Sequence, residues 1–166
     1  MAAEPKRFAR SAALHLAGTP FRMTPARKMG SVKRPAGYSG TPLVAKLGIK
    51  AGARMQIVNP PADFSETLGS LPAGVTSGAR GALEFGMLFV TRKADLARRF
   101  PGLLTRLASN GMLWISWPKQ SSGAPTDLTE NVIRAMGLEL GLVDVKVCAV
   151  DATWSGLKFV RRLSDR

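Results

Sequence analysis

Polar, cationic and aromatic side chains gather in this sequence where the predicted strands end, and these residues are the best placed to bind a ligand. The carboxyl ends of parallel strands meet at one edge of an open sheet, so side chains that follow them converge. Backbone N–H groups and the helix dipole at that edge favour negative charge. We therefore predict a site for a small anionic ligand. Its candidate residues are Asn59, Thr91, Arg92, Trp117, Lys119, Ser121, Asp127, Asp151 and Trp154.

Each candidate also has a purely structural interpretation. Thr91 and Asp127 have the positions of helix caps, and Asp151 has that of a turn former in a hairpin. Trp117 and Trp154 are large aromatic residues, which are usually buried in a core. A ligand site and a set of caps, turns and core side chains both stay open as interpretations.

Residues for catalysis are scarce. The chain has one cysteine, Cys148, and one histidine, His15, which excludes a zinc site built from about four N or S ligands. Cys148 falls in an apolar strand, and Asp127 and Asp151 lack partner groups that would identify a reaction. We therefore assign no catalytic residue, no metal and no known cofactor.

The elements that position these residues alternate between strands and helices. Helix caps and apolar runs predict a helix at 42–47, a brief helix from Asp63 that Gly69 ends, a helix from Thr91 that restarts at Phe100-Pro101, and a helix from Thr126 or Asp127 to Gly141. Strands are predicted at 55–58, 75–78, 85–90, 112–117, 143–150 and 156–163. Strands separated by helices form a parallel sheet that is covered on both faces, and the closing hairpin adds an antiparallel strand. The predicted fold is an α/β Rossmann-like three-layer sandwich.

This order of elements, from about residue 45 to residue 163, resembles the class I methyltransferase variant of the Rossmann-like fold, whose last strand runs antiparallel to the rest. The resemblance implies a site for S-adenosylmethionine after the first strand. However, residues 55–64 read MQIVNPPADF and contain no glycine. The segment after Val75 also has no acidic residue before Glu84, where a methyltransferase would hold ribose hydroxyls.

A second resemblance covers nearly all of residues 37–162. It rests on the motifs GYSGTPL at 37–43, KLGI at 46–49, LWISWPK at 113–119, TDLTE at 126–130, VKVCAVD at 145–151 and TWSGLK at 153–158. On these motifs the chain is similar to a family of small bacterial proteins of unknown function, which supplies no activity.

These observations favour a non-catalytic binding or regulatory module on a degenerate Rossmann-like scaffold, with a small anionic ligand or a protein as its partner. The alternative is an S-adenosylmethionine-dependent methyltransferase in which Asn59 and the backbone of Pro60 and Pro61 replace the glycines. Against that alternative, proline removes backbone N–H donors where a ligand needs close approach.

The charge is unevenly distributed. The net charge is +13, and residues 1–36 hold eight lysines and arginines against Glu4 alone. We predict that residues 1–36 form a disordered basic arm, with Met29 as an alternative start of translation, and that residues 37–166 form the folded domain. Nucleic-acid binding through this arm is the third functional hypothesis. A row of arginines at 92, 99 and 106 is the solvated side of a helix or a grip for phosphates.

No apolar run approaches the roughly 20 residues that cross a bilayer, and the segment from Ser11 to Gly18 is a weak secretion signal because His15 interrupts it. We therefore predict a cytoplasmic protein that does not associate with membranes.

Overall fold

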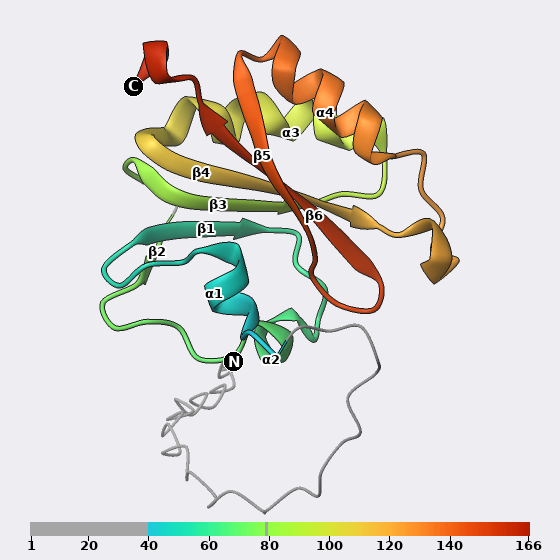
Figure 1. Cartoon of the computed structure of the whole chain (residues 1–166), viewed down its shortest axis with the longest axis horizontal. Coiled ribbons are helices and arrows are strands. Elements are labelled where there is room, and N and C mark those ends of the chain that lie inside the picture. The colour runs from blue at the N-terminus through green and yellow to red at the C-terminus, as the bar shows by residue number, and fades with distance from the viewer. Residues whose placement is uncertain (1–39, 79) are drawn as a thin grey trace, which may run out of the picture. The chain divides into compact units, whose positions relative to one another are not determined.

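The computed structural model describes residues 40–78 and 80–166 (Figure 1). The predicted basic arm and Tyr38 lie outside these residues. The helices are α1 (Leu43–Leu47), α2 (Phe64–Leu68), α3 (Lys93–Arg106) and α4 (Glu130–Glu139), with 3-10 turns η1 (Gln120–Ser122) and η2 (Leu163–Asp165). The strands are β1 (Arg54–Val58), β2 (Thr76–Ser77), β3 (Leu83–Phe89), β4 (Leu107–Pro118), β5 (Leu142–Ala149) and β6 (Trp154–Arg161).

The six strands form one sheet in the order β2-β1-β3-β4-β6-β5. The pairs β1–β2, β1–β3 and β3–β4 are parallel, whereas β6 pairs antiparallel with both β4 and β5. The last strand is therefore inserted antiparallel between β4 and β5. This arrangement confirms the predicted α/β Rossmann-like fold.

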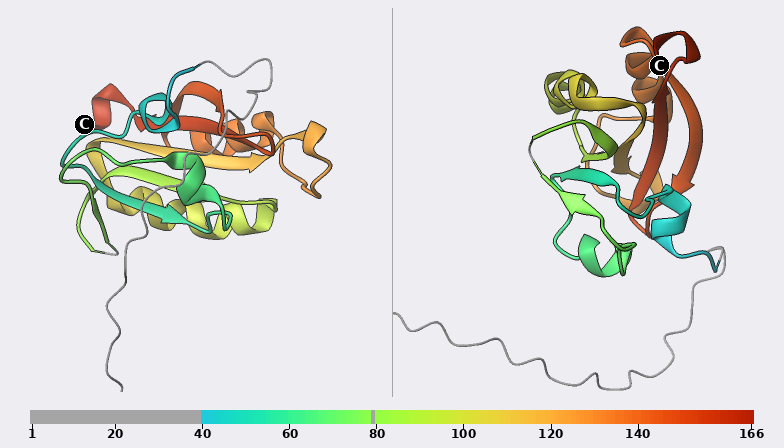
Figure 2. Two further views of the ribbon diagram at one scale, coloured as in Figure 1. Left: turned by 90° about the horizontal axis from the view of Figure 1, so that it is seen from below. Right: turned by 90° about the vertical axis from the view of Figure 1, so that its left-hand side faces the viewer.

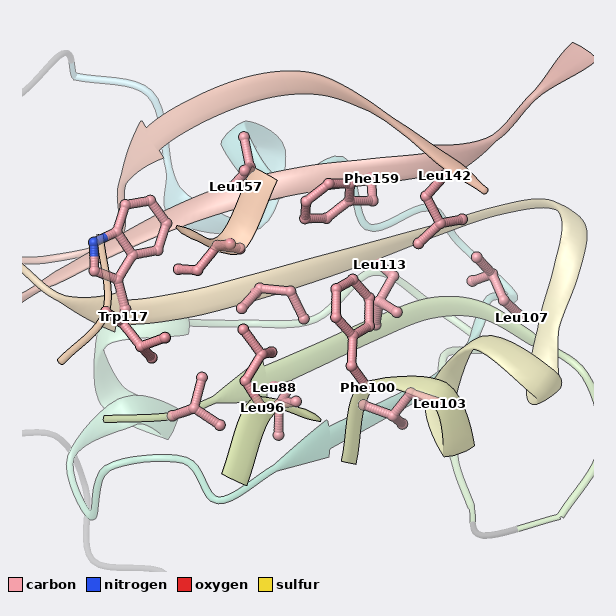
Figure 3. Close-up of a cluster of buried hydrophobic side chains, with 14 of the residues drawn as sticks. Leu88, Leu96, Phe100, Leu103, Leu107, Leu113, Trp117, Leu142, Leu157 and Phe159 are labelled. Atoms are coloured by element: carbon pink, nitrogen blue, oxygen red, sulfur yellow. The ribbon is translucent and has the colours of Figure 1, made fainter. Parts of the chain in front are cut away.

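The two faces of the sheet carry separate hydrophobic clusters, with α3 and α4 over one face and α1 and α2 over the other (Figures 1 and 2). Figure 3 shows the cluster under α3 and α4, where Phe100 of α3 meets Phe159 of β6 at a ring-centroid distance of 5.5 Å. Trp114 and Trp117 lie three residues apart on β4 and belong to opposite clusters, as the alternation of strand side chains predicts. None of the described helices has the length and apolarity needed to cross a membrane.

Helix α3 is anchored at its C-terminal end by Arg106. The guanidinium of Arg106 donates to Gln56 Oε1 of β1 and to the carbonyls of Gly78 and Gly81, at 3.1 and 3.3 Å. Arg106 therefore fastens the connection between β2 and β3 to the helix. Because its guanidinium is engaged in these contacts, Arg106 does not share a solvated or phosphate-binding row with Arg92 and Arg99.

Several predicted boundaries are wrong. The helix expected to restart at Phe100-Pro101 runs without a break through Pro101 as α3. Strand β4 begins at Leu107, directly after α3, although Asn110-Gly111 has the sequence of a turn. The register with β3 jumps from the pair Leu83–Leu107 to the pair Phe85–Met112, so the irregularity takes up the extra residues within the strand. Helix α4 is capped by Thr129 rather than by Thr126 or Asp127.

Candidate functional site

A pocket of about 630 Å³ opens at the carboxyl end of β4, on the face of the sheet that carries α4. We call it the β4–α4 pocket. It lies between the end of β4, the turn η1 and the first turn of α4. Its lining residues are Trp117, Lys119, Gln120, Ser121, Leu128, Thr129, Glu130, Asn131 and Ser155.

The indole of Trp117 forms the floor of this pocket. The residue is only 6% exposed, and Figure 3 shows its indole nitrogen turned away from the neighbouring core side chains. Trp114, on the other face, donates its indole N–H to the carbonyl of Leu47 at 3.0 Å. The N–H of Trp117 has no such acceptor among the described residues, and its nitrogen is not sealed from solvent. An indole N–H that reaches solvent and has no protein acceptor is free to donate a hydrogen bond to a ligand.

The first turn of α4 adds further donors. Thr129 caps the helix, and its Oγ1 accepts a hydrogen bond from the amide of Val132 at 3.3 Å. The amides of Glu130 and Asn131 precede the first intrahelical hydrogen bonds, so the helix itself does not satisfy them. The positive end of a ten-residue helix therefore borders the pocket.

Glu130 also lines the pocket, and its carboxylate takes part in a salt-bridge network with Arg134 and Asp144. Arg134 binds Asp144 at 2.8 Å and Glu130 at 2.5 Å. The hydrogen bond that Arg134 donates to Asp144, followed by the one it donates to Glu130, raises the pKa of the Arg134 guanidinium. Arg134 therefore compensates the negative charge of Glu130, the one acidic side chain that lines the pocket.

Lys119, directly after β4, lines the same pocket and is held by the loop between β5 and β6. Its Nζ donates to the carbonyl of Asp151 at 2.6 Å, and its amide donates to the carbonyl of Thr153 at 2.8 Å. The Oδ1 of Asp151 accepts from the amides of Thr153 and Trp154, both at 2.7 Å. The side chain of Asp151 therefore stabilises the turn, as expected for a turn former, and its carbonyl positions Lys119 at the pocket.

Asp127 and Thr91 have structural partners that the sequence did not predict. The Oδ1 of Asp127 accepts from the amide of Lys93 at 2.7 Å, so Asp127 caps α3 from a distant segment. Thr126 donates its hydroxyl to the carbonyl of Thr91 at 2.7 Å. Arg92 occupies the N-cap position of α3 without a capping side chain and is exposed. These contacts tie the loop before α4 to the start of α3.

The topological switch point lies elsewhere, between the ends of β1 and β3, because the chain leaves these strands toward opposite sides of the sheet. Phe64 and Phe89 pack there with ring centroids 4.7 Å apart, and each is 2% exposed. Trp154 packs on Phe89 at 5.1 Å. Asn59 has a φ of 52°, the left-handed conformation that asparagine tolerates. Aromatic side chains fill the space beside the end of β1.

The nine predicted candidates do not form one site, and Arg92 is exposed at the start of α3. Trp117, Lys119 and Ser121 lie together at the β4–α4 pocket. The carbonyl of Asp151 accepts a hydrogen bond from Lys119 of that group, and Thr91 lies with Asp127 at the start of α3. Asn59 and Trp154 do not line the pocket, and Trp154 packs against the opposite cluster.

The sequence prediction missed the residues of the first turn of α4. Thr126, Asp127 and Thr129 are all good N-cap residues, so local preference did not choose among them. The capping-box spacing from Asp127 to Glu130 favoured the wrong start. The signal for Thr129 was only its position directly before the apolar residues of the helix.

The comparisons with known proteins bear on the fold. No protein-family model matches this chain, and no curated protein matches it significantly. A S-adenosylmethionine-dependent methyltransferase from Aquifex aeolicus is similar in structure, with a TM-score of 0.50 and 16% sequence identity, over 70% of this chain and 86% of that one.

Two other solved structures are similar at lower scores. A ribosomal protein L11 methylase from Lactobacillus delbrueckii subsp. bulgaricus has a TM-score of 0.49 and 12% identity, over 72% of this chain and 75% of that one. A magnesium protoporphyrin IX methyltransferase from Synechocystis with bound S-adenosylmethionine has a TM-score of 0.47 and 12% identity, over 72% and 74%. By fold, the domain is a methyltransferase-like Rossmann domain, as its sheet order and the Aquifex aeolicus structure indicate. At these identities the likeness does not extend to activity.

Proposed function

We propose that this protein is a binding module on a methyltransferase-like scaffold and that the β4–α4 pocket binds a small anionic ligand. The observation that carries the proposal is Trp117, a largely buried residue that lines the pocket and whose indole N–H reaches solvent without a protein acceptor. The amino end of α4 and Lys119 supply positive potential beside it. A carboxylate or phosphate oxygen is the chemistry that such donors recognise.

The test is a thermal-shift measurement on the full chain with inorganic phosphate, acetate and common nucleotides as probes. A probe at a hundredfold excess over its dissociation constant stabilises the native state by about 2.7 kcal/mol. Trp117→Phe keeps an aromatic ring and removes the N–H, so we expect it to weaken binding roughly 10- to 100-fold, as the loss of a hydrogen bond to a charged group does.

The matched control is Trp154→Phe, because Trp154 packs against the opposite face of the sheet. It is expected to keep the ligand-induced shift. The proposal fails when a cooperatively melting protein shows no shift with any anionic probe, or when both variants keep the full shift.

An S-adenosylmethionine-dependent methyltransferase is the second candidate, and the similar fold of the Aquifex aeolicus methyltransferase supports it. The side chains at the switch point argue against it, because Phe64 and Phe89 occupy that region and Pro60-Pro61 lacks backbone donors. S-adenosylmethionine belongs in the same screen. A shift with this probe that Asn59→Ala abolishes and Trp117→Phe leaves intact would establish binding at the switch point and support the methyltransferase hypothesis.

A further inference from the structure

The face of the sheet opposite the pocket carries a pair of like charges. Lys146 of β5 and Lys158 of β6 are direct cross-strand partners, and Lys158 is in turn the partner of Trp114 in β4. Residues that are directly opposite on neighbouring strands share one face, and like charges in such a pair destabilise the sheet. Because this lysine pair does not stabilise the fold, we looked to the binding of a partner to explain it.

Lys50 joins this pair from the turn after α1. The pKa of the Lys158 ammonium is lowered by its burial and then by the charges of Lys146 and Lys50. Lys146 donates its Nζ to the carbonyl of Lys46 in α1 at 3.0 Å, which fixes the side chain beside the helix. Among the described residues, no ion pair includes Lys50, Lys146 or Lys158. We call these three residues the lysine face.

We propose that the lysine face binds the phosphate backbone of nucleic acid. The lysine face gathers three ammonium groups on one side of the sheet, and a nucleic-acid backbone presents negatively charged phosphates at regular spacing. The net charge of +13 adds a long-range attraction for a polyanion. A single phosphate ion would need only the three lysines and would leave that charge unexplained.

The aromatic residues favour a duplex over a single strand. Proteins that bind single strands stack bases on aromatic side chains. In segments 40–78 and 80–166 every tryptophan and phenylalanine except Trp154 is buried. Trp114, the cross-strand partner of Lys158, is fully buried and donates its indole N–H to the carbonyl of Leu47. The three lysines themselves contact phosphates rather than base edges, so we expect binding without sequence preference.

The test uses the full chain and a fluorescently labelled 20-base-pair duplex, with binding followed by anisotropy at several salt concentrations. The logarithm of the affinity falls with the logarithm of the salt concentration, and each phosphate contact contributes about 0.9 to the slope. The double variant Lys146→Gln/Lys158→Gln is expected to bind more weakly and to reduce the slope by about 1.8. The matched control is Lys93→Gln, because α3 lies on the opposite face and Lys93 is exposed.

Circular dichroism and a cooperative melt establish that the double variant is folded. The proposal is wrong when the folded double variant keeps the wild-type affinity and slope, since the contacts would then lie elsewhere. It is also wrong when the duplex does not bind while vesicles that contain phosphatidylserine bind in a lysine-dependent way. The result is independent of the β4–α4 pocket, which the double variant leaves intact.

Discussion

At the scale of single residues, the pair Lys146 and Lys158 has a measurable cost to stability. Removing one of two directly opposed like charges should stabilise the sheet by about 0.5 kcal/mol. We therefore expect Lys158→Gln to raise the free energy of unfolding in urea at low salt, and the gain to shrink in 0.5 M sodium chloride, where the repulsion is screened. Arg162→Gln is the control, because Arg162 is exposed beyond the end of β6 and its side chain forms no ion pair among the described residues.

The sign of the pH dependence supplies a second readout for the same variant. The pKa of Lys158 is lowered in the folded protein, so the unfolded chain binds its proton more tightly. The penalty is complete below the folded pKa and disappears as the pH rises to the ordinary lysine pKa of 10.5. The advantage of Lys158→Gln should therefore vanish in that alkaline range. A constant advantage at all pH values would contradict the electrostatic explanation.

Cys148 is the single thiol of the chain and allows a clean chemical measurement. Burial raises its pKa, while the charges of Lys146, Lys46 and Lys119 oppose that rise. Because the thiolate is the reactive form, we expect Cys148 to react with a disulfide reagent more slowly at pH 8 in the native protein than in urea. Its contribution to stability is complete below the ordinary thiol pKa and is lost as the pH rises through the folded value. Equal rates in both states would exclude a perturbed thiol.

At the scale of elements, two helical glycines should respond in opposite ways to alanine. A Cβ at Gly137 of α4 would lie 2.1 Å from a ring carbon of Phe159, whereas one at Gly102 of α3 would meet nothing within 4 Å. Gly102→Ala should therefore gain up to about 1 kcal/mol from helix propensity. Gly137→Ala should lose about 1–3 kcal/mol, because α4 must move away from β6. Urea denaturation of both variants decides this, and a stabilising Gly137→Ala would show that α4 packs loosely.

Elements with strong local signals could be predicted from the sequence, whereas elements that depend on long-range contacts could not. Apolar runs between turn residues were enough to locate β1, β3 and the hairpin of β5 and β6, because these signals are local. The cap that Asp127 provides to α3 joins residues 34 positions apart, so no local pattern reveals it. The prediction of a turn at Asn110-Gly111 failed for a related reason, since Leu107 and Met112 on either side of it both pair with β3 and the register irregularity takes up the residues between them.

The candidate site was predictable only in part for the same reason. The strand ends placed Trp117, Lys119 and Ser121 at one edge, which needed only the order of the elements. The separation of Trp154 from that group follows from packing on Phe89, and the crowding beside β1 follows from the contact between Phe64 and Phe89. Contacts between side chains distant in sequence decided both outcomes.

At the scale of the whole molecule, the strand order predicts a gradient of stability. Strand β4 is flanked by β3 and β6, and it carries Trp114 on one face and Trp117 on the other. Strand β2 has two exposed residues at an edge, with only β1 as its neighbour. Hydrogen exchange should therefore be slowest in β3 and β4 and much faster around β2 and α2, where opening exposes little buried surface.

This gradient also separates the two proposed binding surfaces. The β4–α4 pocket begins at the protected end of β4, so a ligand there should slow exchange mainly in η1 and the first turn of α4. A duplex on the lysine face should instead slow exchange in α1 and in the edge strand β5. Measurement of exchange with inorganic phosphate and then with the duplex tests both assignments in one experiment. Protection of the same segments by both probes would mean that the protein has a single anion-binding surface rather than two.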